Sequence, residues 1–171
     1  GKGTPIIGVC GGFQMLGTSL DDPYGVEEGG TMRGMELLPI RTIFAEKKTR
    51  TRVTGTARFS EDGEPVKISG YEIHMGRTER GGTPPFCLLA DGTPEGAAAG
   101  NVFGTYLHGV FDAPEAALRT AQALAKKKGV TLTGEALDTH AYKEQQYDKL
   151  ADSVRKSLDM EWIYRIMEGK A

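Results

Sequence analysis

The stretch Gly8-Val9-Cys10-Gly11-Gly12-Phe13-Gln14 decides how this sequence folds, and it completes a short apolar run at residues 5–9. A buried strand that ends in Gly-x-Cys-x-Gly and turns at once into a helix is typical of a nucleophile elbow. Flanking glycines suit a turn too tight for side chains. The elbow points the sulfur of Cys10 at a pocket, at a helix N-terminus whose dipole favours the thiolate. The backbone N–H of Gly11 would face an oxyanion formed beside the sulfur. A buried structural cysteine is the alternative interpretation.

The rest of the chain has the composition of one globular domain. Its 171 residues carry 21 Lys plus Arg and 23 Asp plus Glu, a net charge of −2 that gives no reason to expect nucleic acid or a membrane surface as a partner. No apolar run approaches the roughly 20 residues that span a bilayer. Two cysteines make no disulfide framework, so we expect a reducing, cytoplasmic setting. Because the chain opens on its strand without Met, we expect a fragment of a longer protein.

Apolar spacing predicts a mixture of strands and helices, which is the α/β class. A long loop is expected at residues 21–34, where Gly and Pro are frequent. We expect strands at residues 5–9, 35–44, 48–59, 66–75, 86–90 and 101–107. Helices are expected at residues 13–16, 113–128 and 140–167, the last with a break near residue 158.

Three histidines are available as the base that a cysteine nucleophile needs. His108 follows the strand expected at residues 101–107. Cys10 also ends a strand, and the carboxyl ends of parallel strands share one edge of a sheet, so His108 is the favoured base. His74, in a strand-like segment, is the second candidate. His140 begins a polar helix and is expected to be solvated.

Two other features receive structural interpretations. Cys87 has apolar neighbours that would hide it and raise the pKa of its thiol, so we expect inert core. The basic stretch at residues 47–52 could meet an acidic substrate or a partner domain, although a charged outer strand face is favoured. Neither a phosphate-binding loop nor a zinc-type Cys/His cluster is present in the sequence.

The stretch around Cys10 resembles the nucleophile motif of class I glutamine amidotransferases. More narrowly, the sequence is similar to the glutaminase-like C-terminal domain of the cobyric acid synthase family. The resemblance covers nearly the whole chain in order. It rests on Gly8–Gly17, Asp22–Glu27, Leu37–Pro39 with Thr42 and Lys48, Gly70–Gly76, Gly104–Gly109, and the tail from Tyr147 to Trp162.

The resemblance implies a class I glutamine amidotransferase-like (flavodoxin-like) sheet with flanking helices and its N-terminal strands missing. Residues 1–171 would be a partial domain, with the elbow at 6–17 and a helical tail at about 140–168. An N-terminal ATP-dependent synthetase domain, which uses ATP and magnesium, would be absent. No cofactor or metal is expected in this chain itself.

The same resemblance implies that Cys10 attacks the amide of glutamine, with His108 as base. Gln14, Tyr71 and His74 would contact the bound substrate. Ammonia would pass to the synthetase domain of the same full-length protein, which amidates carboxylates of a corrinoid in cobalamin biosynthesis.

Two departures qualify this expectation. Many class I amidotransferases carry a Glu two residues after the base, where this chain has Val110. The Cys-His pair would then act without a carboxylate or use one from elsewhere, for which Glu72 is a candidate. The loop that supplies a second oxyanion N–H lies upstream of Gly1 in the superfamily, so we expect the isolated chain to hydrolyse glutamine weakly.

Other functions stay open on the residues alone. They are a related amidotransferase (a cobyrinic acid a,c-diamide synthase or a cell-wall amidotransferase), a degenerate partner-binding domain, and an α/β hydrolase or cysteine peptidase.

Overall fold

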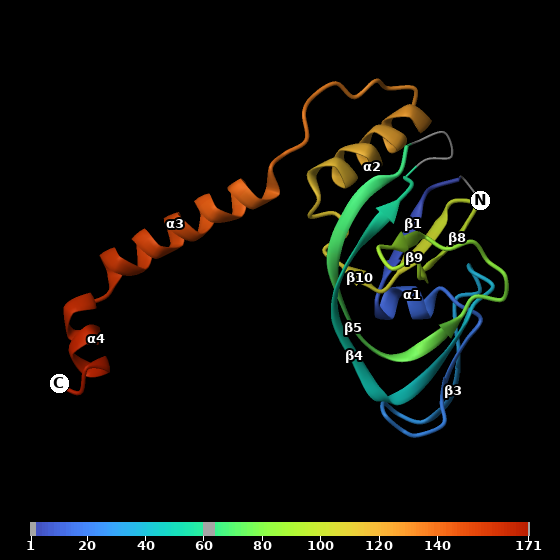
Figure 1. Cartoon of the computed structure of the whole chain (residues 1–171), viewed down its shortest axis with the longest axis horizontal. Helices are drawn as coiled ribbons and strands as arrows, with labels where there is room; N and C mark the ends of the chain where they lie inside the picture. Colours follow the sequence, from blue (N-terminus) through green and yellow to red (C-terminus); the bar gives the residue numbers. More distant parts are fainter. Residues whose placement is uncertain (1–2, 60–63, 171) are drawn as a thin grey trace. The chain divides into compact units, whose positions relative to one another are not determined.

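The computed structural model describes residues 3–59 and 64–170, and two compact units divide the chain. The first unit runs to Glu135 and the second begins at Ala136. The first unit holds two sheets with flanking helices, which confirms the expected α/β class (Figure 1). Within the described residues, no helix is both long and apolar enough to cross a membrane.

The smaller sheet carries the elbow strand. Strand β1 (Ile6–Val9) runs parallel to β9 (Val102–Thr105), and β8 (Ala97–Ala99) completes the sheet antiparallel to β9. Because the pairing of β1 with β9 is parallel, the carboxyl ends of both strands lie at one edge, as the sequence predicted.

The larger sheet is built on two long antiparallel strands, β4 (Arg41–Ala57) and β5 (Val66–Glu79) (Figure 1). Strand β10 (Leu107–His108) pairs antiparallel with β5, so the chain passes from the smaller sheet to the larger one at Tyr106. Strands β6 (Cys87–Leu89) and β7 (Pro94–Glu95) extend the sheet from the end of β4.

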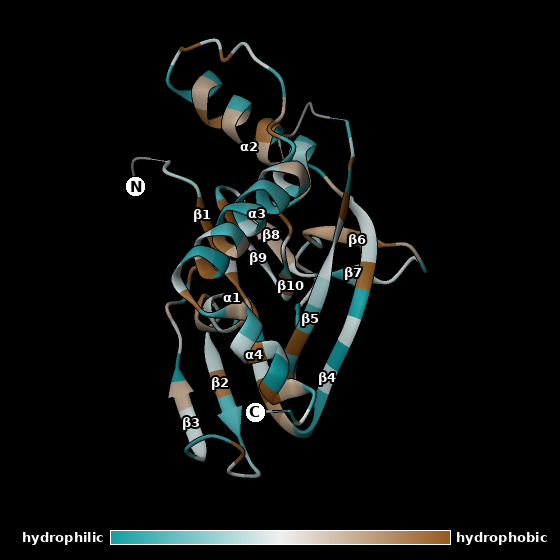
Figure 2. Ribbon diagram, turned by 90° about the vertical axis from the view of Figure 1, so that its left-hand side faces the viewer, coloured by the Kyte–Doolittle hydropathy of each residue, from teal (hydrophilic) through white to brown (hydrophobic). Residues whose placement is uncertain are grey.

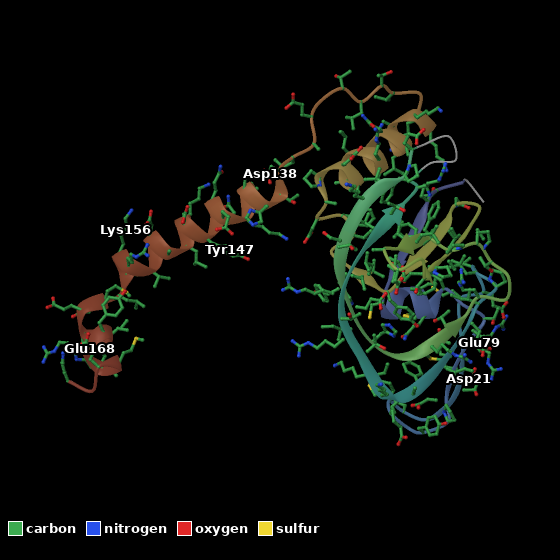
Figure 3. The ribbon with its side chains drawn as sticks, viewed as in Figure 1. Asp21, Glu79, Asp138, Tyr147, Lys156 and Glu168 are labelled. Atoms are coloured by element: carbon green, nitrogen blue, oxygen red, sulfur yellow. The ribbon has the colours of Figure 1, made fainter. Side chains whose placement is uncertain are left out.

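Two further strands border the start of β4. Strand β2 (Ser19–Asp22) pairs parallel with β4, and β3 (Gly30–Arg33) pairs antiparallel with β2. Arg41 forms an ion pair with Asp21, whose pKa it lowers, and it faces Glu79 in register. Asp21 and Glu79 accordingly lie at the same end of the first unit (Figure 3).

Among the described residues, two helices pack in the first unit. Helix α1 (Gly11–Met15) contacts β1 and β9, and α2 (Pro114–Lys127) contacts β5. One buried cluster surrounds α1 and contains Phe13, Leu16, Leu38, Ile40, Ala97, Val102 and Tyr106. The other lies beneath β4 and β5 and contains Ala57, Val66, Ile68, Phe86, Cys87, Leu107, Val110 and Ala116.

As far as residue 170, the second unit contains two helices, α3 (Thr139–Ser157) and α4 (Met160–Met167), and the break between them matches the one expected near residue 158. Asp138 and Asp159 cap the two helix N-termini by accepting hydrogen bonds from the backbone N–H groups of Ala141 and Trp162. Neither helix buries a residue, and α3 is mostly hydrophilic (Figure 2). Figure 3 labels four residues along this unit, which are Asp138, Tyr147, Lys156 and Glu168.

Two expectations for residues 21–44 are wrong. The loop expected at residues 21–34 contains β3 and the end of β2, and Asp22 closes their connection by accepting hydrogen bonds from the backbone N–H groups of Val26, Glu27 and Gly29. Residues 35–40 form no strand. The N–H groups of residues 35–38 instead donate to carbonyls of residues 15–17 at the end of α1, as in the 2.8 Å bond from Met35 to Met15. Free carbonyls at a helix C-terminus need such donors.

The contact between α1 and β9 leaves no room for a side chain at Gly104. A Cβ added there would lie 2.0 Å from Cδ2 of Phe13. We expect Gly104→Ala to lower the free energy of unfolding by about 1–3 kcal/mol, because overpacking forces the ring and strand apart. Gly12→Ala is the matched control, since a Cβ there meets nothing within 4 Å, and it should change stability by less than about 0.5 kcal/mol. Urea unfolding of the two variants measures the difference, and equal stabilities would contradict the packing argument.

Candidate active site

Cys10 sits at a sharp turn between β1 and α1. Its backbone has φ 54° and ψ −115°, a conformation that residues other than Gly rarely adopt. The turn is held on both sides: the Cys10 N–H donates to the carbonyl of Thr105 at 2.9 Å, and the Cys10 carbonyl accepts from Gln14 N–H at 3.1 Å. Strained backbone of this kind collects at functional sites. The strand–turn–helix form of the elbow is therefore present at the cysteine where the sequence placed it.

The glycines around Cys10 have different roles. A Cβ added to Gly8 would lie 2.6 Å from Cδ1 of Leu16 and 2.7 Å from the carbonyl of Gly12, so the strand and α1 approach closely there. A Cβ added to Gly11 or Gly12 would meet nothing within 4 Å. The expectation that the turn has no room for side chains is therefore right for Gly8 and wrong for Gly11 and Gly12. Gly11 is the first residue of α1, a position whose N–H has no acceptor within the helix. That N–H is the expected oxyanion donor.

The sulfur of Cys10 lies at the edge of β5. Its thiol donates to the carbonyl of Ile73 at 3.4 Å. On β5, side chains alternate between the two faces of the sheet, so Tyr71 and Ile73 share one face and Glu72 and His74 share the other. The sulfur therefore lies beside β5, which presents Tyr71 on one face and Glu72 and His74 on the other.

His108 belongs to the face of Tyr71. The two residues are register partners in β10 and β5, and their rings stack with centroids 5.0 Å apart and planes 6° apart. Among the described residues, neither ring nitrogen of His108 makes a hydrogen bond. The ring is thus oriented by stacking, and its nitrogens are available for hydrogen bonds with a ligand on this face.

His74 lies on the opposite face and is already held there. Its ring stacks on Tyr106 with centroids 3.7 Å apart, and its Nδ1 is 3.2 Å from the carbonyl of Gly76. Its Nε2 is 3.8 Å from a carboxylate oxygen of Glu72. Glu72 pairs in register with Leu107, the neighbour of His108, so its side chain points away from the His108 ring. The structure therefore brings Glu72 to His74 and not to the favoured base.

Gln14 links α1 to the larger sheet. Its side chain is 6% exposed, and Nε2 donates to the carbonyl of Met75 at 3.2 Å and to the hydroxyl of Tyr106 at 3.4 Å. The amide nitrogen of Gln14 thus already donates to groups of the protein itself. Contact between Gln14 and a bound substrate stays a prediction. Of the three expected substrate-binding residues, only Tyr71 shares the face of His108.

Each face of β5 borders an open space. On the face of Tyr71, a hollow of about 890 Å³ is lined by Arg50, Thr51, Arg52, Val53, Thr54, Ser69, Gly70, Tyr71 and Ile73. On the opposite face, a cavity of about 370 Å³ is bordered by Glu72, His74, Glu95 and Tyr106, among others. Of these two spaces, only the first is lined by Ile73 and Tyr71. The carbonyl of Ile73 contacts the Cys10 thiol, and Tyr71 stacks on His108.

Glu95 is a buried carboxylate that the sequence analysis did not single out, and it contacts the strand that binds the Cys10 N–H. Glu95 is 7% exposed and accepts hydrogen bonds from the Thr105 hydroxyl, the Tyr106 N–H and the Cys87 thiol. Burial raises the pKa of Glu95, and these three donors act against that rise. In the sequence, Glu95 stands between Pro94 and Gly96 and is indistinguishable from a turn residue.

The described parts of the chain offer no cluster for a metal. Within residues 3–59 and 64–170, no group of three or more His, Cys, Asp and Glu side chains could hold an ion.

The family match is found over the part of the chain that contains the elbow and His108. Residues 1–116 match the family described as CobB/CobQ-like glutamine amidotransferase domain. The chain belongs to this family. The expected amidotransferase-like fold and enzyme class are thereby confirmed, and the roles of individual residues stay predictions.

Curated relatives are similar along almost the whole chain. A cobyric acid synthase of Ruminiclostridium cellulolyticum is 47% identical over 182 residues, covering 98% of this chain and 35% of that protein. Cobyric acid synthases of Lachnoclostridium phytofermentans and Alkaliphilus metalliredigens are each 40% identical, covering 98% and 99% of this chain and 36% and 37% of those proteins. The chain thus spans 35–37% of the length of these relatives.

The two cysteines should differ sharply in reactivity. Cys87 is 3% exposed, and burial together with the neighbouring Glu95 carboxylate raises the pKa of its thiol, as the sequence predicted. We expect iodoacetamide at pH 8 to modify Cys10 at least about tenfold faster than Cys87 in the folded protein. Peptide mapping over time measures both rates.

Two controls make this comparison specific. Cys10→Ser should abolish the fast labelling, and in 6 M guanidinium chloride both thiols should react at similar rates. Equal rates in the folded protein would contradict the assignment of Cys87 to an inert core.

Proposed function

We propose that this chain hydrolyses glutamine, with Cys10 as the nucleophile and His108 as the group that moves protons. The observation that carries the proposal is the strained turn at Cys10, which directs the thiol to the carbonyl of Ile73 in β5. His108 pairs with Tyr71, two residues before Ile73 on the same strand. The family, whose name states glutamine amidotransferase activity, supports the same reaction.

The reaction proceeds in two balanced halves. The Cys10 sulfur attacks the side-chain amide carbon of glutamine while His108 accepts the thiol proton. The developing oxyanion is stabilised by the N–H of Gly11. The C–N bond then breaks as His108 returns the proton to the leaving nitrogen, giving ammonia and a thioester. Water, deprotonated by His108, attacks the thioester, and glutamate leaves as the Cys10 thiol is restored.

His108 is preferred to His74 as the base because of what already binds each ring. His74 is engaged by the carbonyl of Gly76, the ring of Tyr106 and the nearby Glu72 carboxylate. Among the described residues, the His108 ring is stacked on Tyr71 alone, and Tyr71 lines the larger hollow. That hollow of about 890 Å³ has room for glutamine, and Tyr71 would form one of its walls.

The destination of the ammonia is inferred from the names and lengths of the relatives. Proteins named cobyric acid synthase match nearly all of this chain with about a third of their own length. We infer that the ammonia is used by an ATP-dependent synthetase domain of the same protein, which amidates carboxylates of a corrinoid. ATP and magnesium would supply the activation of those carboxylates there, and the residues of this chain supply ammonia.

A glutamine analogue tests the nucleophile and its substrate class together. 6-Diazo-5-oxo-L-norleucine alkylates a thiol that is activated beside a glutamine pocket. We expect intact-mass measurement and peptide mapping to find a single adduct on Cys10, absent from Cys87 and suppressed by excess glutamine. Rapid labelling of Cys10 by iodoacetamide without reaction with the analogue would contradict the substrate class. A Cys10 inert to both reagents would contradict the nucleophile.

Paired histidine variants test the base. We expect His108→Ala to lower the rate of glutamine hydrolysis by about 100-fold or more, the usual contribution of a general base. His74→Ala is the matched comparison, and its effect should fall mainly on stability because that ring packs on Tyr106. Ammonia release, normalised to the folded fraction, measures both. A larger loss of turnover in His74→Ala would reverse the assignment.

A further inference from the structure

The strand that joins the two sheets creates a buried donor that neither sheet satisfies. Strand β9 ends at Thr105 in the smaller sheet, and β10 begins at Leu107 in the larger one. Tyr106, between them, is 6% exposed, and its backbone N–H belongs to neither ladder. A buried N–H of this kind must find another acceptor.

Glu95 supplies that acceptor and fixes the neighbouring residues as well. One carboxylate oxygen accepts the Tyr106 N–H at 2.6 Å, and the other accepts the Thr105 hydroxyl at 2.6 Å. The same hydroxyl oxygen accepts the Leu107 N–H at 3.0 Å. A single side chain therefore sets the backbone path of three successive residues at the crossing point.

Both members of the proposed catalytic pair depend on this crossing. The carbonyl of Thr105 binds the N–H of Cys10, at the start of the fixed segment. His108 follows Leu107 directly, at its end, and stacks on Tyr71. The path of residues 105–107 thus determines how far the Cys10 thiol lies from the His108 ring.

We propose that Glu95 is a positioning residue for the glutaminase reaction, because its carboxylate sets the offset between Cys10 and His108 through residues 105–107. This inference rests on the proposed function of that pair. Glu95 makes no hydrogen bond to either catalytic residue, so it acts through the strand alone.

The network offers both a disruptive variant and a matched control. Glu95→Ala removes all three bonds of the carboxylate, and Thr105→Val removes the hydroxyl link while keeping the side-chain shape. Glu95→Gln keeps an oxygen that can accept the Tyr106 N–H. Cys87→Ala removes only the third donor, the thiol 3.2 Å from the carboxylate, and leaves residues 105–107 untouched.

The experiment measures labelling of Cys10 by 6-diazo-5-oxo-L-norleucine against reagent concentration, at a temperature where urea unfolding shows each variant to be folded. We expect Glu95→Ala and Thr105→Val to lower the maximal labelling rate about 10–100-fold, since small misplacements of reacting groups have effects of this size. The concentration of glutamine that gives half-protection should stay within about twofold, because residues 105–107 do not line the hollow on the Tyr71 face. Glu95→Gln should retain an intermediate rate, and Cys87→Ala should match the parent chain.

Hydrogen exchange of the Tyr106 N–H provides a second, independent readout. We expect Glu95→Ala to speed this exchange strongly and Cys87→Ala to leave it unchanged. If Glu95→Ala does not fold, Glu95→Gln and Thr105→Val decide the outcome by the same measurements. Labelling at the parent rate in folded Glu95→Ala or Thr105→Val, or a loss confined to stability, overturns the inference. A parent chain that the analogue does not label overturns the proposed function instead, and with it the role assigned to Glu95.

Discussion

The passage of one strand from the smaller sheet to the larger one at Tyr106 is the constraint on which the site depends. Before the crossing, the Thr105 carbonyl holds the amide of Cys10; after it, His108 pairs with Tyr71. A strand can change sheets only if the backbone groups between the two ladders find other partners. The buried carboxylate of Glu95 meets that need by accepting the Tyr106 N–H, and in the proposed reaction it would thereby govern the offset between Cys10 and His108.

Helix α1 is too short to be stable by itself, and its place is set by what touches it. A helix of five residues gains little from internal hydrogen bonds, so tertiary contacts must hold it. Phe13 packs against Gly104 of β9, and Gln14 donates to the carbonyl of Met75 in β5. The helix is therefore anchored to both sheets, one turn away from the sulfur. The turn at Cys10 can keep its strained conformation because its two ends are fixed.

Sequence patterns predicted the local parts of this structure and missed the parts made by distant contacts. The elbow, the parallel meeting of β1 with the strand before His108, and the helices from residue 114 onward follow from short-range apolar spacing and turn residues. Strand β3 is exposed throughout and has no apolar alternation, so no periodic signal marked it. Glu95 was missed because burial of a carboxylate depends on donors at residues 105 and 106, which the sequence near Glu95 does not show.

The position two residues after His108 is part of the apolar core and suits Val110 better than a carboxylate. Val110 is 2% exposed within the cluster beneath β4 and β5. A Glu at that position would lose its hydration among apolar side chains, which is unfavourable. Glu72 cannot replace it, because register places its side chain on the other face of β5, beside His74. The stacked ring of Tyr71 remains as the group that orients the His108 ring. Orientation by an aromatic face, with no carboxylate behind the proposed base, is thus the arrangement that this core favours.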